Sequence, residues 1–366
     1  MKLAQTDYIN DVSDTLLDSH VLIKEPLCLT IEGFSFQVRS NSIELLDKLR
    51  CYFAGMCTAT TQRGVEIIAI ERDAADLAIN FTDWSREPGK TGRKDSYVDF
   101  SGARLLRKVR TGMLFLQSAS HRIAAGPCLA NENQVINFIN AQYMNWLQQQ
   151  GWLICHAAGL VHNDKAYAIA GFSGGGKSTQ MLHLLNGENT AYMTNDRLFV
   201  RAEDGFTKAT GIPKLPRVNP GTIVHNPKLH ELISEQQKSA LLSMPQQELW
   251  ELEHKYDVFI DKIYGPDRIV FSAPLAALII LNWRHDSQQP MSVEKIKLAD
   301  RRDLLHAVMK SPGPFYQYPD GRFYQDSTAL EEQAYIEALG NNAVYEVRGK
   351  VDFEGLTRYF NKEIFC

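Results

Sequence analysis

A short turn followed by a run of glycines constrains the fold of this 366-residue chain more than any other feature. Residues 157–160 and 165–170 are apolar like two strands, and residues 161–164 between them have turn composition. The second strand leads directly into the glycine-rich segment 171–179, and helical spacing begins at Ser178. Parallel neighbours need a crossover of about a dozen residues or more, so these strands must pair antiparallel. The sequence therefore predicts a hairpin that feeds a strand–loop–helix unit.

The glycine-rich segment matches the Walker A pattern G-x-x-x-x-G-K-[ST], which is typical of loops that bind nucleotide phosphates. Glycines let backbone N–H groups point into one concavity, and the following helix adds the positive end of its dipole. Three consecutive glycines weaken a fold unless their amides are used, which disfavours a flexible loop without a ligand. The residues expected to bind ATP are Gly171, Ser173, Gly174, Gly175, Gly176, Lys177, Ser178 and Thr179.

Two residues outside the loop are candidates for the chemistry. Phosphoryl transfer also needs a carboxylate for Mg²⁺ and a group that orients or deprotonates the nucleophile. Asp196 precedes the apolar strand 198–200 and can face the phosphates from that sheet edge, with a turn-forming role as the alternative. His156 starts the hairpin and can approach the same carboxylate, with a buried structural histidine as the alternative. We expect Ser178 and Asp196 to hold Mg²⁺.

The rest of the chain alternates between strand and helix patterns. Hydrophobic alternation predicts a hairpin over 27–38, and helical spacing after Ser42 predicts a capped helix over 42–53. A helix over 132–150 precedes the first strand of the glycine-loop hairpin. The C-terminal third predicts a buried strand at 275–282, helices at 301–309, 330–339 and 353–360, and a strand at 342–347. We expect an α/β chain, with an α+β N-terminal region over 1–130 and a P-loop catalytic domain over 131–366.

The composition argues against two classes of partner, nucleic acids and membranes. The net charge is −4 and the pI is near 6.2, so the whole chain lacks the basic footprint of a nucleic-acid-binding protein. The basic stretch 104–110 is interrupted by apolar residues, which indicates a half-buried element with a basic face. No apolar run approaches the roughly 20 residues that span a bilayer, and residues 1–7 lack the apolar core of a secretory signal. We expect a cytoplasmic protein without a membrane or nucleic-acid partner.

At these residues the chain resembles the C-terminal catalytic domain of HPr kinase/phosphorylase, and more closely the HPr-kinase-related kinases. The resemblance rests on Cys-His-Ala-Ala-Gly at 155–159, the hairpin, the glycine-rich loop and Asn-Asp-Arg at 195–197, and covers roughly residues 150–265. The loop is also similar to that of ATP-dependent phosphoenolpyruvate carboxykinases, which share this type of fold. The resemblance implies a P-loop domain on a mixed, largely antiparallel sheet. It also implies homo-oligomers, because HPr kinases assemble as hexamers.

The resemblance implies roles for individual residues. His156 matches the catalytic-loop histidine of the family, and Lys177 and Ser178 match its loop lysine and hydroxyl. Asn195 and Asp196 stand where the family has two adjacent aspartates, of which the first serves as general base. An amide cannot take a proton at neutral pH. Either Asp196 or His156 is then the base, or catalysis is altered.

A segment rich in proline and basic residues lies at 211–222. It departs from the HPr kinase signature and resembles the corresponding block of the HPr-kinase-related subgroup. Lys214 and Arg217 in it are candidates for contacts to the transferred phosphate or the acceptor, Arg217 through its planar guanidinium. A proline-rich surface loop is the alternative. The charged residues 251–257 either line the acceptor site or form a solvated face.

The sequence predicts an ATP-dependent kinase that uses Mg²⁺ and transfers the γ-phosphate to an acceptor, most simply a hydroxyl. The acceptor is a small molecule or a protein, and the residues do not identify it. The candidate catalytic residues are His156, Lys177, Asn195, Asp196 and Arg217. One alternative is a nucleotide-binding switch or scaffold with little transfer activity, which Asn195 supports. The other is a lyase like phosphoenolpyruvate carboxykinase, whose lysine and histidine metal ligands and oxaloacetate-binding arginine form no clear set here.

Overall fold

The computed structural model of this chain describes residues 5–59, 64–75, 77–86, 91–100, 102–172, 174–252 and 254–365. The chain forms two compact units. The first comprises Met1–Gln150 with Ser311–Ala329, and the second Gly151–Lys310 with Leu330–Cys366. Each unit combines helices with a mixed sheet, so the α/β fold class is confirmed.

The division between the units differs from the boundary expected after residue 130. Helix α3 (Glu132–Gln149) belongs to the first unit because it packs against α2 (Ile43–Tyr52) and β3 (Val65–Glu71). The segment Ser311–Ala329 also belongs there, far along the chain from the rest of that unit. Neither assignment follows from local composition, because both depend on which surface the segment packs against.

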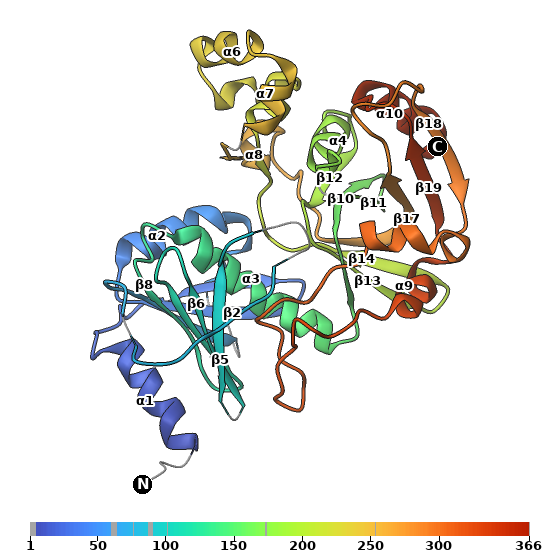
Figure 1. The fold of residues 1–366 in the computed structure, drawn as a ribbon. Coiled ribbons are helices and arrows are strands. Elements are labelled where there is room, and N and C mark those ends of the chain that lie inside the picture. Colours follow the sequence, from blue (N-terminus) through green and yellow to red (C-terminus); the bar gives the residue numbers. More distant parts are fainter. Residues whose placement is uncertain are drawn as a thin grey trace. The chain divides into compact units, whose positions relative to one another are not determined.

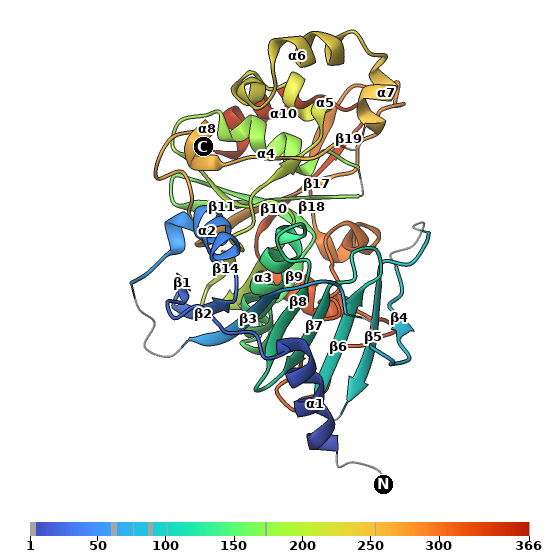
Figure 2. The ribbon, with the colours of Figure 1, turned by 90° about the vertical axis from the view of Figure 1, so that its left-hand side faces the viewer.

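The first unit is built on one sheet of eight strands among the described residues, in the order β1-β2-β3-β8-β7-β6-β5-β4, which Figure 2 shows side by side. Its remaining elements are β1 (Leu27–Ile31), β2 (Phe34–Ser40), β4 (Thr82–Asp83), β5 (Asp95–Phe100), β6 (Ala103–Lys108), β7 (Leu114–Ser118), β8 (Arg122–Gly126), α1 (Gln5–Leu17) and the 3₁₀ turn η1 (Ala54–Met56). The predicted hairpin is confirmed as β1–β2. The predicted cap is also confirmed, since the Leu45 amide donates to Ser42 Oγ at 3.2 Å.

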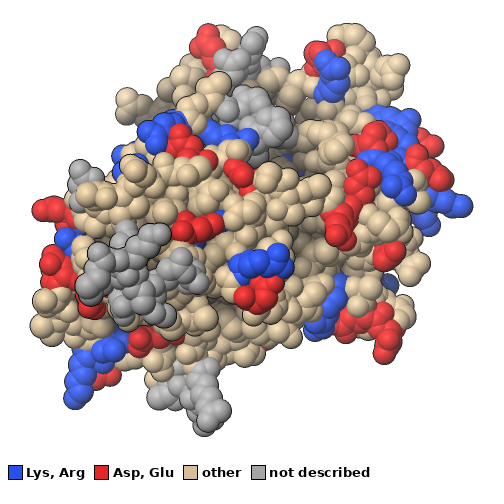
Figure 3. Space-filling model, turned by 60° about the horizontal axis from the view of Figure 1, so that its bottom comes forward, with Lys and Arg blue, Asp and Glu red and all other residues tan. Residues whose placement is uncertain are grey.

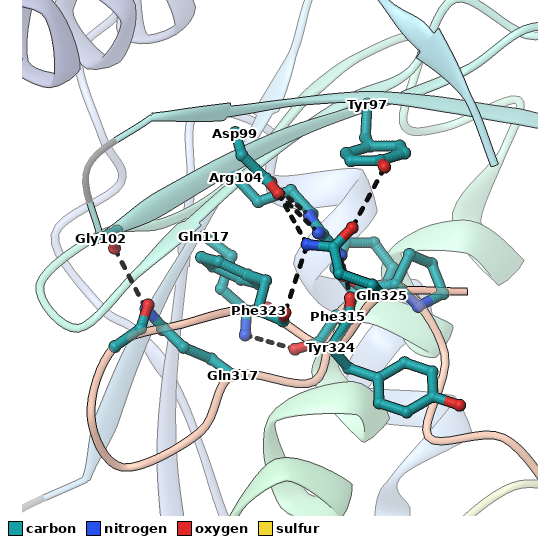
Figure 4. Close-up of polar contacts among 12 residues, drawn as sticks. Tyr97, Asp99, Gly102, Arg104, Gln117, Phe315, Gln317, Phe323, Tyr324 and Gln325 are labelled. Atoms are coloured by element: carbon teal, nitrogen blue, oxygen red, sulfur yellow. Dashed lines mark hydrogen bonds and ion pairs between the residues drawn. The ribbon is translucent and has the colours of Figure 1, made fainter. Parts of the chain in front are cut away.

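The basic stretch 104–110 is partly inside the first unit. Arg104 on β6 is 1% exposed, and its guanidinium makes two hydrogen bonds to the Asp99 carboxylate at 2.6 and 2.8 Å. Its Nη1 donates to the carbonyls of Pro314 and Tyr324, and its guanidinium lies 4.4 Å from the ring centroid of Tyr97 (Figure 4). The half-buried element that we expected is therefore correct. Arg104 additionally ties Ser311–Ala329 to the sheet.

The second unit contains a sheet of nine strands among the described residues. The order is β12-β10-β11-β17-β14-β13-β9, with β19 paired to β17 and β18 to β19. Only β11–β17 and β17–β19 are parallel there, which confirms a mixed and largely antiparallel sheet. The strands are β9 (Leu153–Cys155), β10 (Ala157–His162), β11 (Lys165–Gly171), β12 (Thr190–Thr194), β13 (Leu198–Glu203), β14 (Phe206–Thr210), β17 (Ser272–Leu281), β18 (Ser292–Ile296) and β19 (Ala343–Arg348).

The predicted hairpin before the glycine-rich loop is β10–β11, paired antiparallel from Ala157↔Ala170 to His162↔Lys165. Its turn is shorter than expected, because only Asn163 and Asp164 lie outside the ladder, with φ of 46° and 63°. Positive φ at both central residues matches the twist of a two-residue hairpin, and Asn and Asp tolerate it well.

The two faces of this sheet pack against different helices. Leu160 on β10 belongs to the same core cluster as Met181 of α4 (Lys177–Leu185), while its neighbour Val161 belongs to a second cluster with Leu339 of α9 (Glu332–Leu339). Successive strand residues point to opposite faces, so one strand serves both cores. Figure 1 shows α4 and α9 on opposite sides of β17.

The second unit contains further short elements. They are β15 (Arg217–Val218), α5 (Pro220–Val224), η2 (Pro227–Leu232), α6 (Glu235–Leu242), α7 (Gln246–Glu251), β16 (Tyr256–Asp257), α8 (Ile260–Ile263), η3 (Leu298–Asp300), η4 (Arg302–Ala307), α10 (Phe353–Tyr359) and the π-helical η5 (Phe360–Ile364). The helix expected over 301–309 is instead the 3₁₀ helix η4. The expected terminal helix is α10, continued by η5.

Charges of both signs are mixed on the face of the molecule drawn in Figure 3, where no large area is of one sign. Many of the exposed charges are in local pairs, such as Arg284 with Asp286 and Arg322 with Asp320. Within the described part of the chain, no helix has both the length and the apolar character needed to cross a bilayer.

Candidate active site

The glycine-rich loop joins β11 to α4 in the second unit. Gly174 and Gly176 have φ of 77° and 80°, a left-handed conformation that other residues rarely adopt. A Cβ built on Gly176 would lie only 2.6 Å from ring carbons of Phe353, so this position lacks room for a side chain as well. The pattern therefore places glycine where both the backbone and the packing require it.

Hydrogen bonds hold the loop in a closed turn. The Gly175 amide donates to the Phe172 carbonyl at 3.0 Å, and Trp283 Nε1 donates to the Gly175 carbonyl at 2.9 Å. Lys177 is 9% exposed, and its Nζ donates to the Gly171 carbonyl at 2.8 Å. The loop lysine thus lies against its own loop at the N-terminus of α4, where the helix dipole favours an anion.

A cavity of about 570 Å³ opens beside this loop and lies wholly within the second unit. Its volume falls within the range of about 300–1,000 Å³ that small-molecule sites occupy. Sequence-predicted residues that line it are His156, Gly174, Gly175, Gly176, Lys177, Ser178, Thr179, Asn195, Asp196, Lys214 and Arg217. Gly171 is not in this lining, and Ser173 lies outside the described residues. The structure brings these residues together, while their roles in binding and catalysis stay predictions.

His156 and Asp196 are brought together by strand pairing. Strand β9 pairs antiparallel with β13, with Cys155 opposite Leu198, so the residue after β9 meets the turn before β13. His156 Nε2 lies 3.2 Å from Asp196 Oδ1. The His156 amide also donates to the Val308 carbonyl at 2.7 Å, which fixes its backbone. The predicted approach of the histidine to the carboxylate is therefore confirmed as geometry.

The charge of Asp196 is stabilised from three sides. Lys310 Nζ lies 3.8 Å and Arg197 Nε 3.9 Å from Asp196 Oδ2. Burial alone would raise the pKa of Asp196, but the hydrogen bond from His156 and the charges of Lys310 and Arg197 hold the pKa well below its ordinary value. Asp196 is thus an anion at neutral pH and a weak proton acceptor, which suits a cation ligand better than a base.

Lys310 was missed by sequence reasoning. It follows η4 and the β-bridge between Met309 and Cys155, so it comes to Asp196 through tertiary structure. A single lysine after an apolar turn carries no specific signal, so the sequence contained no basis for choosing it.

Asn195 stands beside Asp196, where the resemblance places the general base. Its Oδ1 atom is buried and has no hydrogen-bond partner among the described residues. The turn itself is held by Thr194 Oγ1, which donates to the Arg197 carbonyl at 3.0 Å. The position therefore offers a neutral amide and no proton acceptor.

The segment around Lys214 and Arg217 is part of the cavity wall. Residues 211–213, 216 and 218 are buried, so the alternative of a proline-rich surface loop is wrong. Burial lowers the pKa of Lys214 to about 8, the charge of Arg197 adds to this, and Asp196 opposes it. Arg217 Nε lies 3.0 Å from Asp257 Oδ1 across the β15–β16 pair. Arg217 thus faces the cavity while held by a carboxylate. Lys255, from the charged stretch 251–257, also lines the cavity, and Glu253 lies outside the described residues.

The fit of the cavity to Mg²⁺ depends on Asp196 and Ser178. The described residues contain no group of three or more histidine, cysteine, aspartate or glutamate side chains arranged to hold a metal ion. Mg²⁺ is usually bound through one or two carboxylates together with waters and substrate phosphates, and does not need such a group. One anionic carboxylate and a hydroxyl in the same cavity as the loop fit that pattern.

Comparisons with known proteins add little to this geometry. No protein-family model matches the sequence, and no curated protein matches it. Among solved structures, the Hpr(Ser) kinase/phosphatase from Coxiella burnetii is similar at 12% identity with a TM-score of 0.27, over 57% of this chain and 85% of that one. At so low a score, any function has to be supported by the site of this chain.

Proposed function

We propose that the second unit is an ATP-dependent kinase that transfers the γ-phosphate to a hydroxyl of a small-molecule or protein acceptor. The observation that carries this proposal is the juxtaposition, in one cavity, of the loop residues 174–179 and the His156–Asp196 pair. A loop for phosphates and a carboxylate–imidazole pair are the parts that phosphoryl transfer requires.

The nucleotide phosphates bind to backbone amides of the loop and the N-terminus of α4. Lys177 exchanges its bond to the Gly171 carbonyl for a phosphate oxygen and neutralises charge there. Ser178 and Asp196 hold Mg²⁺ directly or through water. When bound, Mg²⁺ neutralises charge that develops on the phosphate oxygens.

In the transfer step, the acceptor oxygen forms a bond to the γ-phosphorus while the bond from that phosphorus to the β–γ bridging oxygen breaks. ADP leaves with that electron pair. The hydroxyl proton passes to the His156 imidazole, and Asp196 stabilises the resulting imidazolium across their 3.2 Å contact. Asn195 orients the acceptor without taking its proton, and Arg217, fixed by Asp257, faces the transferred group.

ADP release in the presence of Mg²⁺-ATP tests this proposal, with a panel of amino acids, sugars and lysate proteins as acceptors. Lys177→Ala should abolish release that depends on an acceptor. Lys165→Ala is the matched control, because this lysine is exposed at the far end of β11. ADP release that neither substitution changes, or that never depends on an acceptor, would contradict the proposal of a kinase.

A nucleotide-binding switch or scaffold is the second candidate, because Asn195 occupies the position at which a base is expected. Such a protein would bind Mg²⁺-ATP through the same loop and show no acceptor-stimulated turnover. Binding that is lost in Lys177→Ala, together with absent turnover across the panel, would favour this candidate.

A further inference from the structure

Two aromatic side chains lie together in the cavity wall, and neither the sequence motifs nor the transfer step uses them. Trp250 of α7 and His285 both line the cavity, with ring centroids 4.0 Å apart and planes tilted by 40°. Trp250 is 41% exposed although it faces a concave site. α7 belongs to the arm of short helices beyond α4 that Figure 1 shows in yellow.

Contacts place this aromatic pair beside one end of the phosphate-binding loop. His285 lies two residues after Trp283, whose indole donates to the Gly175 carbonyl. On the other side, Thr179 Oγ1 lies 2.8 Å from Thr222 Oγ1. The preceding residue, Gly221, lies beside the indole, since a Cβ built there would be 3.6 Å from Trp250 Cδ1, an ordinary van der Waals distance. The pair therefore adjoins Gly175 and Thr179.

The other end of the loop, where it begins, lies beside His156 and Asp196. His156 directly precedes β10, whose first residue pairs with Ala170, so it lies next to the start of the loop and holds Asp196 there. In loops of this pattern the backbone amides bind the α- and β-phosphates, and the lysine reaches the β- and γ-phosphates. With the γ-phosphate towards His156 and Asp196, the nucleoside extends towards Thr179 and the aromatic pair.

We infer that Trp250, backed by His285, forms the stacking platform for the base of the nucleotide whose phosphates bind the loop. This inference rests on the nucleotide of the proposed function. Every nucleobase has a flat π-face, and stacking on an exposed aromatic ring buries both surfaces. Burial lowers the pKa of His285 against the opposing charge of Asp286, so a neutral imidazole supports the indole.

A stacking platform recognises the π-face of a base and does not read its edge. It therefore contributes to the binding of adenine and guanine nucleotides alike, and adds nothing to the binding of a phosphate chain without a base. The contribution of the platform can therefore be measured apart from that of the loop, because the loop holds the phosphates of ligands with and without a base.

Calorimetric titration with Mg²⁺-ADP, Mg²⁺-GDP and Mg²⁺-pyrophosphate tests the platform without turnover. Trp250→Ala should weaken both nucleotides about tenfold and change pyrophosphate affinity by less than about twofold. Trp250→Phe keeps an aromatic face and should retain most of the affinity, which guards against a loss caused by misfolding. Phe206→Ala is the matched control, because Phe206 is 45% exposed and not in the cavity lining.

Equal losses of ADP and pyrophosphate affinity in Trp250→Ala, or no loss of either, would overturn the platform while leaving the phosphate-binding loop intact. If the unaltered protein bound neither ADP nor pyrophosphate, the nucleotide proposal would fall together with the platform. A selective loss of the nucleotides, retained in part by Trp250→Phe, would establish the base site.

Discussion

Lys310 Nζ lies 3.8 Å from Asp196 Oδ2, although the two residues are far apart in the chain. The same segment also accepts a hydrogen bond from the His156 amide at the Val308 carbonyl, 2.7 Å away. One stretch of chain thus supports the backbone of the histidine and the charge of the carboxylate. Directly after Lys310, the chain passes into the segment Ser311–Ala329 of the first unit.

Lys310→Met should lower the turnover of the proposed reaction about tenfold, because Asp196 loses a cation that stabilises its charge. The apparent Mg²⁺ requirement should fall, because removing the neighbouring ammonium strengthens the attraction of the Asp196 carboxylate for Mg²⁺, while Lys310→Arg should restore much of the rate. Steady-state kinetics over a range of Mg²⁺ concentrations measures both effects. Lys297→Met, at an exposed lysine before η3, is the control. Equal behaviour of the two methionine variants would refute the role of Lys310.

His156→Gln should lower kcat by about 10²- to 10⁴-fold, the usual contribution of a general base. The dissociation constant of Mg²⁺-ADP should change little, because the loop amides and Lys177 remain in place. Rapid-quench kinetics and calorimetry separate the two quantities. A large loss of nucleotide affinity with normal turnover would assign His156 to binding and not to proton transfer.

Arg104→Met should destabilise the first unit by about 2–4 kcal/mol, because it leaves the carboxylate of Asp99 and two backbone carbonyls without their buried donor. Urea denaturation followed by circular dichroism measures the loss. Arg322→Met removes an exposed arginine of the same unit that is paired with Asp320, and should leave the midpoint unchanged. Similar midpoints for the two variants would show that the Arg104 cluster is not stabilising.

Glu346 on β19 should make the free energy of unfolding fall as the pH is lowered. Its carboxylate is fully buried and is bonded by Arg301, Arg348 and Asn282, the last at 2.7 Å. Burial would raise its pKa, but these donors outweigh it and lower the pKa from 4.5 to about 2. Because the folded-state pKa lies below the unfolded one, this stabilisation is complete above pH 4.5 and is lost as the pH falls towards 2.

Glu346→Gln should therefore lower the free energy of unfolding by about 2 kcal/mol at pH 7 and flatten its decline in acid. Urea denaturation at a series of pH values measures both. Glu332→Gln, a substitution at a partly exposed ion pair with Arg302, should leave the slope unchanged. An unaltered slope in Glu346→Gln would mean that other carboxylates set the acid sensitivity.

Local patterns predicted the parts of this protein that local interactions build. Ser42 caps α2 as expected, and the glycines at 174 and 176 adopt the left-handed conformation that the loop requires. The antiparallel β10–β11 hairpin followed from the length of its connection alone. The 3₁₀ helix η4 was expected as an α-helix, because the spacing of apolar residues does not distinguish the two over so short a segment.

By itself, the sequence determined the hairpin, the glycine-rich loop, the helix after it and the candidates His156 and Asp196, because each depends on neighbours along the chain. Only the tertiary structure decided that Lys310 reaches Asp196, that Trp250 meets His285, and that Ser311–Ala329 belongs to the first unit. These contacts join residues that are distant in the chain. Strand register and helix packing decide which distant surfaces meet, and local sequence patterns do not predict these contacts.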